Sequence, residues 1–391
     1  MSKSNNFTKT LYKISLLFLV FLHTHAWFTW PIEFLSFIPN TLLRLGLAVL
    51  ALVYAQTNGI RLHFNYKIWI GTICFLIASN IPFVSFGEML AQIVLFIPIA
   101  VLICDNVNAK EHLRFISVCL SFVLIPGFFL YVLKLFGYFG FWGIPIQYGD
   151  LNVNATYTFM NYGFMLVRTW EAADIRFTSI FLEPGYMGTL VSFMLYANSY
   201  NFKKWYNIVL LVALFFSFSL AGYVVTFVGY ILYCVSIKKN ISHLLGFGFL
   251  MVIIFLASQE YNNGNNMINE LIVERLEFDE DKGIKGNDRF KGDTDWIYEK
   301  SIRTGSFLFG DPTVKNLTGA GYKVFLVNRG IITAFLYFVF YYNIAICSKR
   351  KKFYSKSFLF IIFLTFLQAA YPSSYSWIIP YLLGTKNDEK L

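Results

Sequence analysis

The stretch WYNIVLLVALFFSFSLAGYVVTFVGYILYCVSI (residues 205–237) decides the fold of this chain. It is mostly apolar and lies between two lysine pairs, Lys203–Lys204 and Lys238–Lys239. A bilayer core about 30 Å thick needs roughly 20 apolar residues per helix, so the stretch fits one overlong helix or two short ones. A single crossing would place the later lysines outside, against the tendency of cytoplasmic loops to carry Lys and Arg. The stretch therefore predicts a helical hairpin that turns near Ser219.

Similar apolar runs recur along the chain of 391 residues, of which 57% are hydrophobic and only 14% are charged. This composition is far outside the range of a soluble domain. We expect an all-α, polytopic integral membrane protein, a single transmembrane domain (1–391) with about 11–12 transmembrane helices. Besides the hairpin, the expected spans lie near Leu11–Phe28, Leu42–Tyr54, Ile68–Phe83, Glu88–Cys104, Leu113–Phe136, Pro184–Tyr200, His243–Ala257, Lys323–Ile346 and Phe358–Leu383. The last of these is interrupted at Tyr371–Ser374, which indicates either a second hairpin or one crossing.

The net charge of +10 comes from basic clusters in short loops, including Lys110 with Arg114 and the run Lys349–Lys352. This placement is typical of the positive-inside rule and does not favour a nucleic-acid partner. It predicts a multi-pass protein of the bacterial inner membrane, with a cytoplasmic N-terminus and the lipid bilayer as its surroundings. The first apolar run, Leu11–Trp30, lacks a small-residue cleavage site and is interpreted as an uncleaved helix.

Two long loops fall on the external side of this topology, residues 137–182 and residues 259–320. Both are too long to be simple connections. The second is rich in charge of both signs, and we expect a helix from Met267 to Phe278 within it. All five cysteines lie in or near apolar runs, which gives no disulfide framework and no zinc spacing. No metal and no cofactor is therefore expected. The five histidines lie outside both loops and are assigned no role.

The segment from Arg176 to Gly188 is the strongest candidate site, because it carries two ionisable residues into an apolar span. Proline disfavours a helical residue before it, so Glu183 should cap a helix that starts at Pro184. The unpaired N–H groups and the dipole of that first turn favour a nearby anion. An arginine at the membrane interface and an ordinary proline-started helix explain the same spacing equally well.

An Arg-x(6)-Glu-Pro-Gly-Tyr segment after a long external loop resembles the Wzy-type O-antigen and capsular polysaccharide polymerases. Ser217-Phe-Ser219-Leu-Ala-Gly222 is similar to the Ser-Arg-Gly turn of that family, with leucine in place of arginine. A third similarity runs from Asp288-Arg289-Phe290 through Trp296 and Leu308-Phe-Gly-Asp311 to Arg329-Gly330.

The resemblance implies a GT-C-like membrane glycosyltransferase of lipopolysaccharide or capsule biosynthesis. Such an enzyme joins oligosaccharide repeat units carried on undecaprenyl diphosphate at the external face and releases undecaprenyl diphosphate. Arginine suits the diphosphate because its guanidinium stays charged and binds phosphate in a bidentate manner. Arg176 and Glu183 are therefore the expected catalytic residues, with Glu183 as the base. Arg289 and Arg329 are expected to bind diphosphate, and Arg168 to line the sugar path.

The same resemblance leaves two alternatives. An O-antigen ligase uses the same donor, but its functional histidine lies in a large external loop, and neither loop here contains one. A flippase or transporter of lipid-linked oligosaccharide would show paired halves and charges near the midplane, whereas the halves of this chain are unlike. For a polymerase, a flippase and a chain-length regulator are the implied protein partners.

Overall fold

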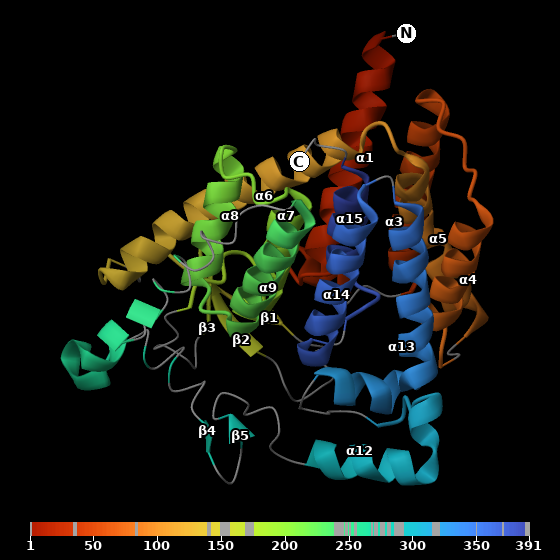
Figure 1. Cartoon of the computed structure of the whole chain (residues 1–391). Helices are drawn as coiled ribbons and strands as arrows, with labels where there is room; N and C mark the ends of the chain where they lie inside the picture. The colour runs from red at the N-terminus through yellow and green to blue at the C-terminus, as the bar shows by residue number, and fades with distance from the viewer. Residues whose placement is uncertain are drawn as a thin grey trace.

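The computed structural model describes residues 2–33, 37–82, 85–138, 142–148, 157–168, 176–237, 246, 249, 252–253, 256–266, 269, 273, 278–279, 283–284, 293–314, 321–348, 350–369 and 371–387. These residues form a helical bundle with two small sheets at one end (Figure 1). The long helices are α1 (Ser2–Leu22), α3 (Phe37–Thr57), α4 (Tyr66–Ser79), α5 (Phe86–Cys104), α6 (Ala109–Leu135), α7 (Pro184–Ala197), α8 (Trp205–Phe216), α9 (Leu220–Ile237), α13 (Gly321–Cys347), α14 (Lys352–Gln368) and α15 (Tyr375–Lys386).

Both expected hairpins are present as pairs of helices. Residues 205–237 form α8 and α9, which are joined at Ser217–Ser219. The last apolar stretch forms α14 and α15, and the connection is held where the Tyr341 hydroxyl donates to the Pro372 carbonyl at 2.7 Å. The expected span His243–Ala257 falls mostly on residues outside the described ones.

Among the described helices, five are long and apolar enough to cross a membrane: α3, α5, α6, α9 and α13. This bears out a membrane protein built from helices. Several of the other expected spans are shorter, with 14 residues in α7, 12 in α8 and 12 in α15. The total of 11–12 crossings therefore stays a prediction.

The structure is mostly helical, as expected for an all-α membrane protein, and short strands occur in the two loops. The first loop contains an antiparallel sheet of β1 (Ile144–Tyr148), β2 (Tyr157–Asn161) and β3 (Leu166–Arg168). The second loop contains the short strands β4 (Phe278–Asp279) and β5 (Gly283–Ile284) and the helix α12 (Asp293–Thr304). Most of the helix expected at Met267–Phe278 lies outside the described residues, and Phe278 belongs to β4. Alternating β-branched and aromatic residues, as in β2, suit a half-covered sheet better than a helix.

The sheets and α12 lie at one end of the bundle, which we call the loop end, and both chain termini lie toward the other, the terminal end (Figure 1). At the terminal end the Lys386 ammonium donates to the Leu102 carbonyl at 2.6 Å, which ties α15 to α5. Asp105, directly after α5, accepts hydrogen bonds from the Tyr54 hydroxyl at 2.6 Å and pairs with His112 Nε2 at 2.9 Å. Buried polar groups of three helices are thus joined in one network.

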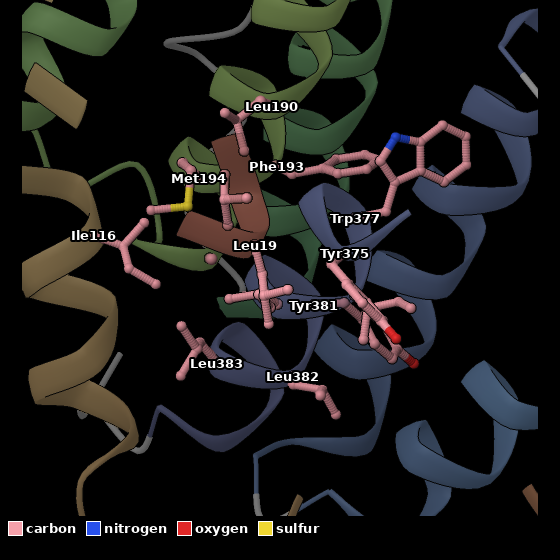
Figure 2. Packing of buried hydrophobic residues seen from close by; sticks show 14 of the residues in the cluster. Leu19, Ile116, Leu190, Phe193, Met194, Tyr375, Trp377, Tyr381, Leu382 and Leu383 are labelled. Atoms are coloured by element: carbon pink, nitrogen blue, oxygen red, sulfur yellow. The ribbon is translucent and has the colours of Figure 1, made fainter. Parts of the chain in front are cut away.

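Helix α7 forms the centre of the bundle, since every residue from Met187 to Ala197 is buried. A helix that is apolar on all sides must be surrounded by others. Figure 2 shows its Leu190, Phe193 and Met194 among residues of α1, α6 and α15. These core side chains are Leu19, Ile116, Tyr375, Trp377, Tyr381, Leu382 and Leu383.

Candidate functional site

The loop end contains the starts of two parallel helices, α7 and α15. They pack side by side, with the Phe193 ring in the second half of α7 5.6 Å from the Trp377 ring near the start of α15, and Gly384 against Ala197 further on. At 1.5 Å per residue, α7 is roughly 21 Å long and α15 roughly 18 Å, both shorter than a bilayer core. The N–H groups of the first turn of a helix have no partner within that helix. Unpaired N–H groups of both helices therefore point toward the loop end.

Helix α7 starts as its sequence predicts. Glu183 is the N-cap residue with extended backbone (φ −141°, ψ 149°), and Pro184 occupies the first turn. The Glu183 side chain does not bond the N–H groups of that turn. A Cβ placed on Gly185 would meet no atom within 4 Å, so there is open space beside the second residue of the helix. This is the arrangement in which a helix N-terminus can accept an anion.

The sheet of the first loop places Arg168 beside the start of α7. Arg168 lies opposite Phe159 in the β2–β3 pairing, and paired residues of antiparallel strands share one face. Phe159 is 2% exposed in a small apolar cluster with Trp30, Leu166 and Leu182, so this face is the one packed on the bundle. The guanidinium Nη2 of Arg168 reaches Glu183 Oε1 at 3.4 Å, with side-chain exposures of 16% and 47%. Two of the candidate residues are thus brought together.

Two histidines that follow α1, His23 and His25, lie at the site, although no role was expected for any histidine. His25 has a left-handed backbone (φ +52°), held where the Trp30 indole N–H donates to the His25 carbonyl at 2.9 Å. Its Nδ1 lies 3.2 Å from the Tyr148 hydroxyl, and its ring lies 5.1 Å from that of Tyr186. His25 lies outside both loops in the sequence, but the sheet of the first loop folds back onto the end of α1 and contacts it.

Tyrosines complete the rim of the site. The Tyr186 hydroxyl of α7 donates to the Tyr371 hydroxyl at 3.2 Å, which joins the start of α7 to the segment before α15. His23 packs edge-on against Tyr375, the first residue of α15, with ring centroids 4.6 Å apart. Aromatic rings with polar tips therefore surround the two helix starts. No spacing in the sequence could reveal this set, because its members come from three distant segments.

Arg176 lies at the entrance to the segment that precedes Glu183. It is half-buried, and the next residue is fixed where the Phe177 N–H donates to the Phe216 carbonyl at 2.9 Å, at the end of α8. The turn between α8 and α9 packs closely against α7. A Cβ on Gly188 would lie only 2.7 Å from the Ser219 Cβ. The segment matched to the Ser-Arg-Gly turn therefore supports the first turns of α7.

Arg329 lies apart from these residues, at a sharp break in α13. Gly330 has φ +79° and ψ 163°, so residues Gly321–Arg329 run in a different direction from the rest of the helix (Figure 1). The Arg329 Nη1 donates to the Ile81 carbonyl at 2.9 Å. Arg289 falls outside the described residues.

The site combines Arg168, the carboxylate of Glu183 that it holds and two helix N-termini, while Arg176 lies at the entrance to the segment before Glu183. Such a set can stabilise an anionic leaving group and accept a proton. Among the described residues there is no group of three or more His, Cys, Asp or Glu that could hold a metal ion. No family model, no curated protein and no solved structure matches this chain.

Proposed function

We propose that this chain is a membrane glycosyltransferase that polymerises oligosaccharide repeat units carried on undecaprenyl diphosphate, at the external face of the bacterial inner membrane. One observation carries the proposal: the Arg168–Glu183 pair stands at the start of the half-length helix α7, beside the start of α15. A lipid diphosphate needs a cationic site within reach of the membrane, and a glycosyl transfer needs a proton acceptor at the same place.

The groups of the site suit each part of this reaction. A sugar hydroxyl of one lipid-linked unit attacks the anomeric carbon of the other, and the bond from that carbon to the diphosphate oxygen breaks. Arg176 and the N–H groups at the start of α7 stabilise the negative charge on the departing undecaprenyl diphosphate. Glu183 accepts the proton of the attacking hydroxyl, and Arg168 orients its carboxylate.

The oligosaccharide fits the aromatic rim of the site. Tyr148, Tyr186 and Tyr371 offer ring faces for stacking on sugars and hydroxyls for hydrogen bonds. The implied protein partners, a flippase that delivers the units and a chain-length regulator, belong to the same proposal.

Two other functions use the same features. Transport of the lipid-linked unit is favoured by the broken helix α13 and the short helices α7 and α15, because transporters build their sites from interrupted helices. An O-antigen ligase is no longer disfavoured by the lack of a loop histidine, since His25 contacts Tyr148 of the first loop. The products distinguish the three: a longer polymer, an unchanged unit across the bilayer, or a glycan on lipid A-core.

The experiment is the polysaccharide ladder of a deletion strain complemented with variants at matched expression. Arg176→Lys keeps the charge but loses the bidentate fork, and Glu183→Gln keeps the shape but loses the base. Both variants should reduce the yield of long chains at least tenfold. Most of the remaining product should be single repeat units. Arg303 and Glu299 form an exposed pair at 3.7 Å on α12, so Arg303→Lys and Glu299→Gln are matched controls and should give normal ladders. Normal ladders from Arg176→Lys and Glu183→Gln would remove the site from the mechanism.

A further inference from the structure

A polar cavity lies at the loop end, on other elements than those that carry Arg168 and Glu183. It has a volume of about 80 Å³ and lies between the end of α4, the start of α5 and the break in α13. A buried water needs roughly 10–15 Å³ of such space, so the cavity holds several waters or one edge of a sugar ring. Its lining is Ser79, Asn80, Pro82, Ser85, Glu88, Gln92 and Arg329.

The cavity is held rigidly by the contact between Gly330 and the loop before α13. A Cβ on Gly330 would lie 2.4 Å from the Leu308 carbonyl oxygen, and a Cβ on Gly310 would lie 2.5 Å from the Arg329 nitrogen. Two backbones can approach this closely only where both residues are glycine. The Asp311 N–H adds a hydrogen bond to the Val327 carbonyl at 2.7 Å. Arg329 is therefore positioned by its backbone on both sides.

The side chains of the cavity are directed by regular structure. Glu88 and Gln92 stand four residues apart on one face of α5, and the Ser85 hydroxyl caps that helix by accepting from the Glu88 N–H at 3.2 Å. Asn80 is anchored where its side-chain N–H donates to the Leu76 carbonyl at 2.7 Å. Within the described part of the chain, the Gln92 amide has no hydrogen-bond partner.

The charge of the lining decides which ligand class fits. Among the described lining residues there are one cation and one carboxylate, and one hydrogen-bond donor of the Arg329 guanidinium is already used by the Ile81 carbonyl. Arg44 of α3 interacts electrostatically with Glu88 from outside the lining. A phosphate in this cavity would meet the negative charge of Glu88 at close range. A neutral polyol can donate to Glu88 and accept from Arg329, so it uses both.

We propose that this cavity binds one edge of an uncharged sugar residue of the oligosaccharide and is not a diphosphate site. The inference rests on the proposed function and gives Arg329 a different ligand from the one expected from sequence. Paired amide, hydroxyl, carboxylate and guanidinium groups match the alternating donors and acceptors of sugar hydroxyls. The cavity would then select the sugar, while the start of α7 holds the diphosphate.

The test is saturation-transfer NMR on the full chain in lipid nanodiscs, with galactose, mannose, glucose and N-acetylglucosamine as separate probes. At least one sugar should show transfer from the wild type. Gln92→Leu should reduce that signal at least fivefold. Gln56→Leu, an exposed glutamine at the terminal end, should leave it unchanged. Inorganic pyrophosphate at equal concentration should not displace the sugar.

A second variant, Glu88→Gln, keeps the inference testable if Gln92→Leu does not fold. Glu88→Gln removes the negative charge of the cavity, so this variant should gain pyrophosphate binding that the Gln56→Leu control lacks. The inference is overturned if no sugar gives a signal, if Gln92→Leu binds sugar as well as Gln56→Leu does, or if pyrophosphate displaces the sugar from the wild type. These outcomes involve no turnover. If no sugar gives a signal but the deletion strain makes single repeat units, only the claim that the cavity binds a sugar is overturned. A normal ladder in the deletion strain would overturn the proposed function.

Discussion

The closest backbone approach at the loop end gives a quantitative prediction for Gly330→Ala. An alanine at φ +79° and ψ 163° adds strain of about 1–3 kcal/mol. Its Cβ would lie 2.4 Å from the Leu308 carbonyl oxygen, whereas contacts under 3.0 Å are essentially never seen, so Leu308 must retreat by roughly 0.6 Å. Overpacking of this kind adds about 1–3 kcal/mol. The hydrogen bond from the Asp311 N–H to the Val327 carbonyl should open with the displaced loop.

The control is Gly305→Ala in the loop before α13, which also has a positive φ. Gly305 has φ +77°, but a Cβ there would meet nothing within 4 Å, so the variant carries only the backbone strain. Hydrogen–deuterium exchange of the peptide around Asp311 measures the difference. At about 1.4 kcal/mol per factor of ten, exchange in Gly330→Ala should be about 5- to 150-fold faster than in Gly305→Ala. Equal exchange in the two variants would refute the close contact that positions Arg329.

Three further predictions concern topology and the terminal end. A single cysteine at Gln147, exposed on β1, should react with a membrane-impermeant thiol reagent in intact spheroplasts and one at Gln56 should not; the reverse pattern would contradict the external placement of the loops. Burial alone would raise the pKa of Asp105, but hydrogen bonds from a histidine, a tyrosine and a backbone N–H hold the pKa below its usual range. Asp105→Asn should therefore lower the free energy of unfolding by about 1.5–3 kcal/mol at pH 7. The difference in melting temperature between the variant and the wild type should become smaller as the pH falls below about 4. A difference that does not depend on pH would contradict this. Arg350 is 5% exposed and lies 3.5 Å from the centre of the Tyr354 ring, so Arg350→Lys should lose the stacking and about 1–2 kcal/mol, and an unchanged melting temperature would count against that contact.

The helices of this chain follow from its hydropathy because burial in lipid requires long apolar runs. The hairpin at 205–237 is confirmed. Hydrophobic periodicity could not distinguish one helix from two in this stretch, whereas the distribution of lysines predicted two. Charge distribution is a property of the whole chain and is therefore informative about connectivity. The small sheet of the first loop was missed, since its strands of three to five residues carry too little pattern to detect.

The candidate site was only partly foreseeable. The cap at Glu183 and the helix start at Pro184 follow from the conformational limits of proline, and the structure has both. The pairing of Arg168 with Glu183 depends on strand register, which short-range sequence patterns do not fix. His25 enters through a left-handed turn after α1, a conformation that is uncommon for residues other than glycine. Tertiary contacts of this kind have no local signature.

The central claim, polymerisation of lipid-linked repeat units, is tested most directly with the purified full chain in proteoliposomes. The substrate is a synthetic repeat unit on undecaprenyl diphosphate, and the products are separated by gel electrophoresis while free undecaprenyl diphosphate is measured by mass spectrometry. The account predicts a ladder of chain lengths, with one undecaprenyl diphosphate released for each linkage formed. Glu183→Gln should abolish both signals. Repeat units that stay unlinked, whether they remain in place or cross the bilayer intact, would contradict the proposed function.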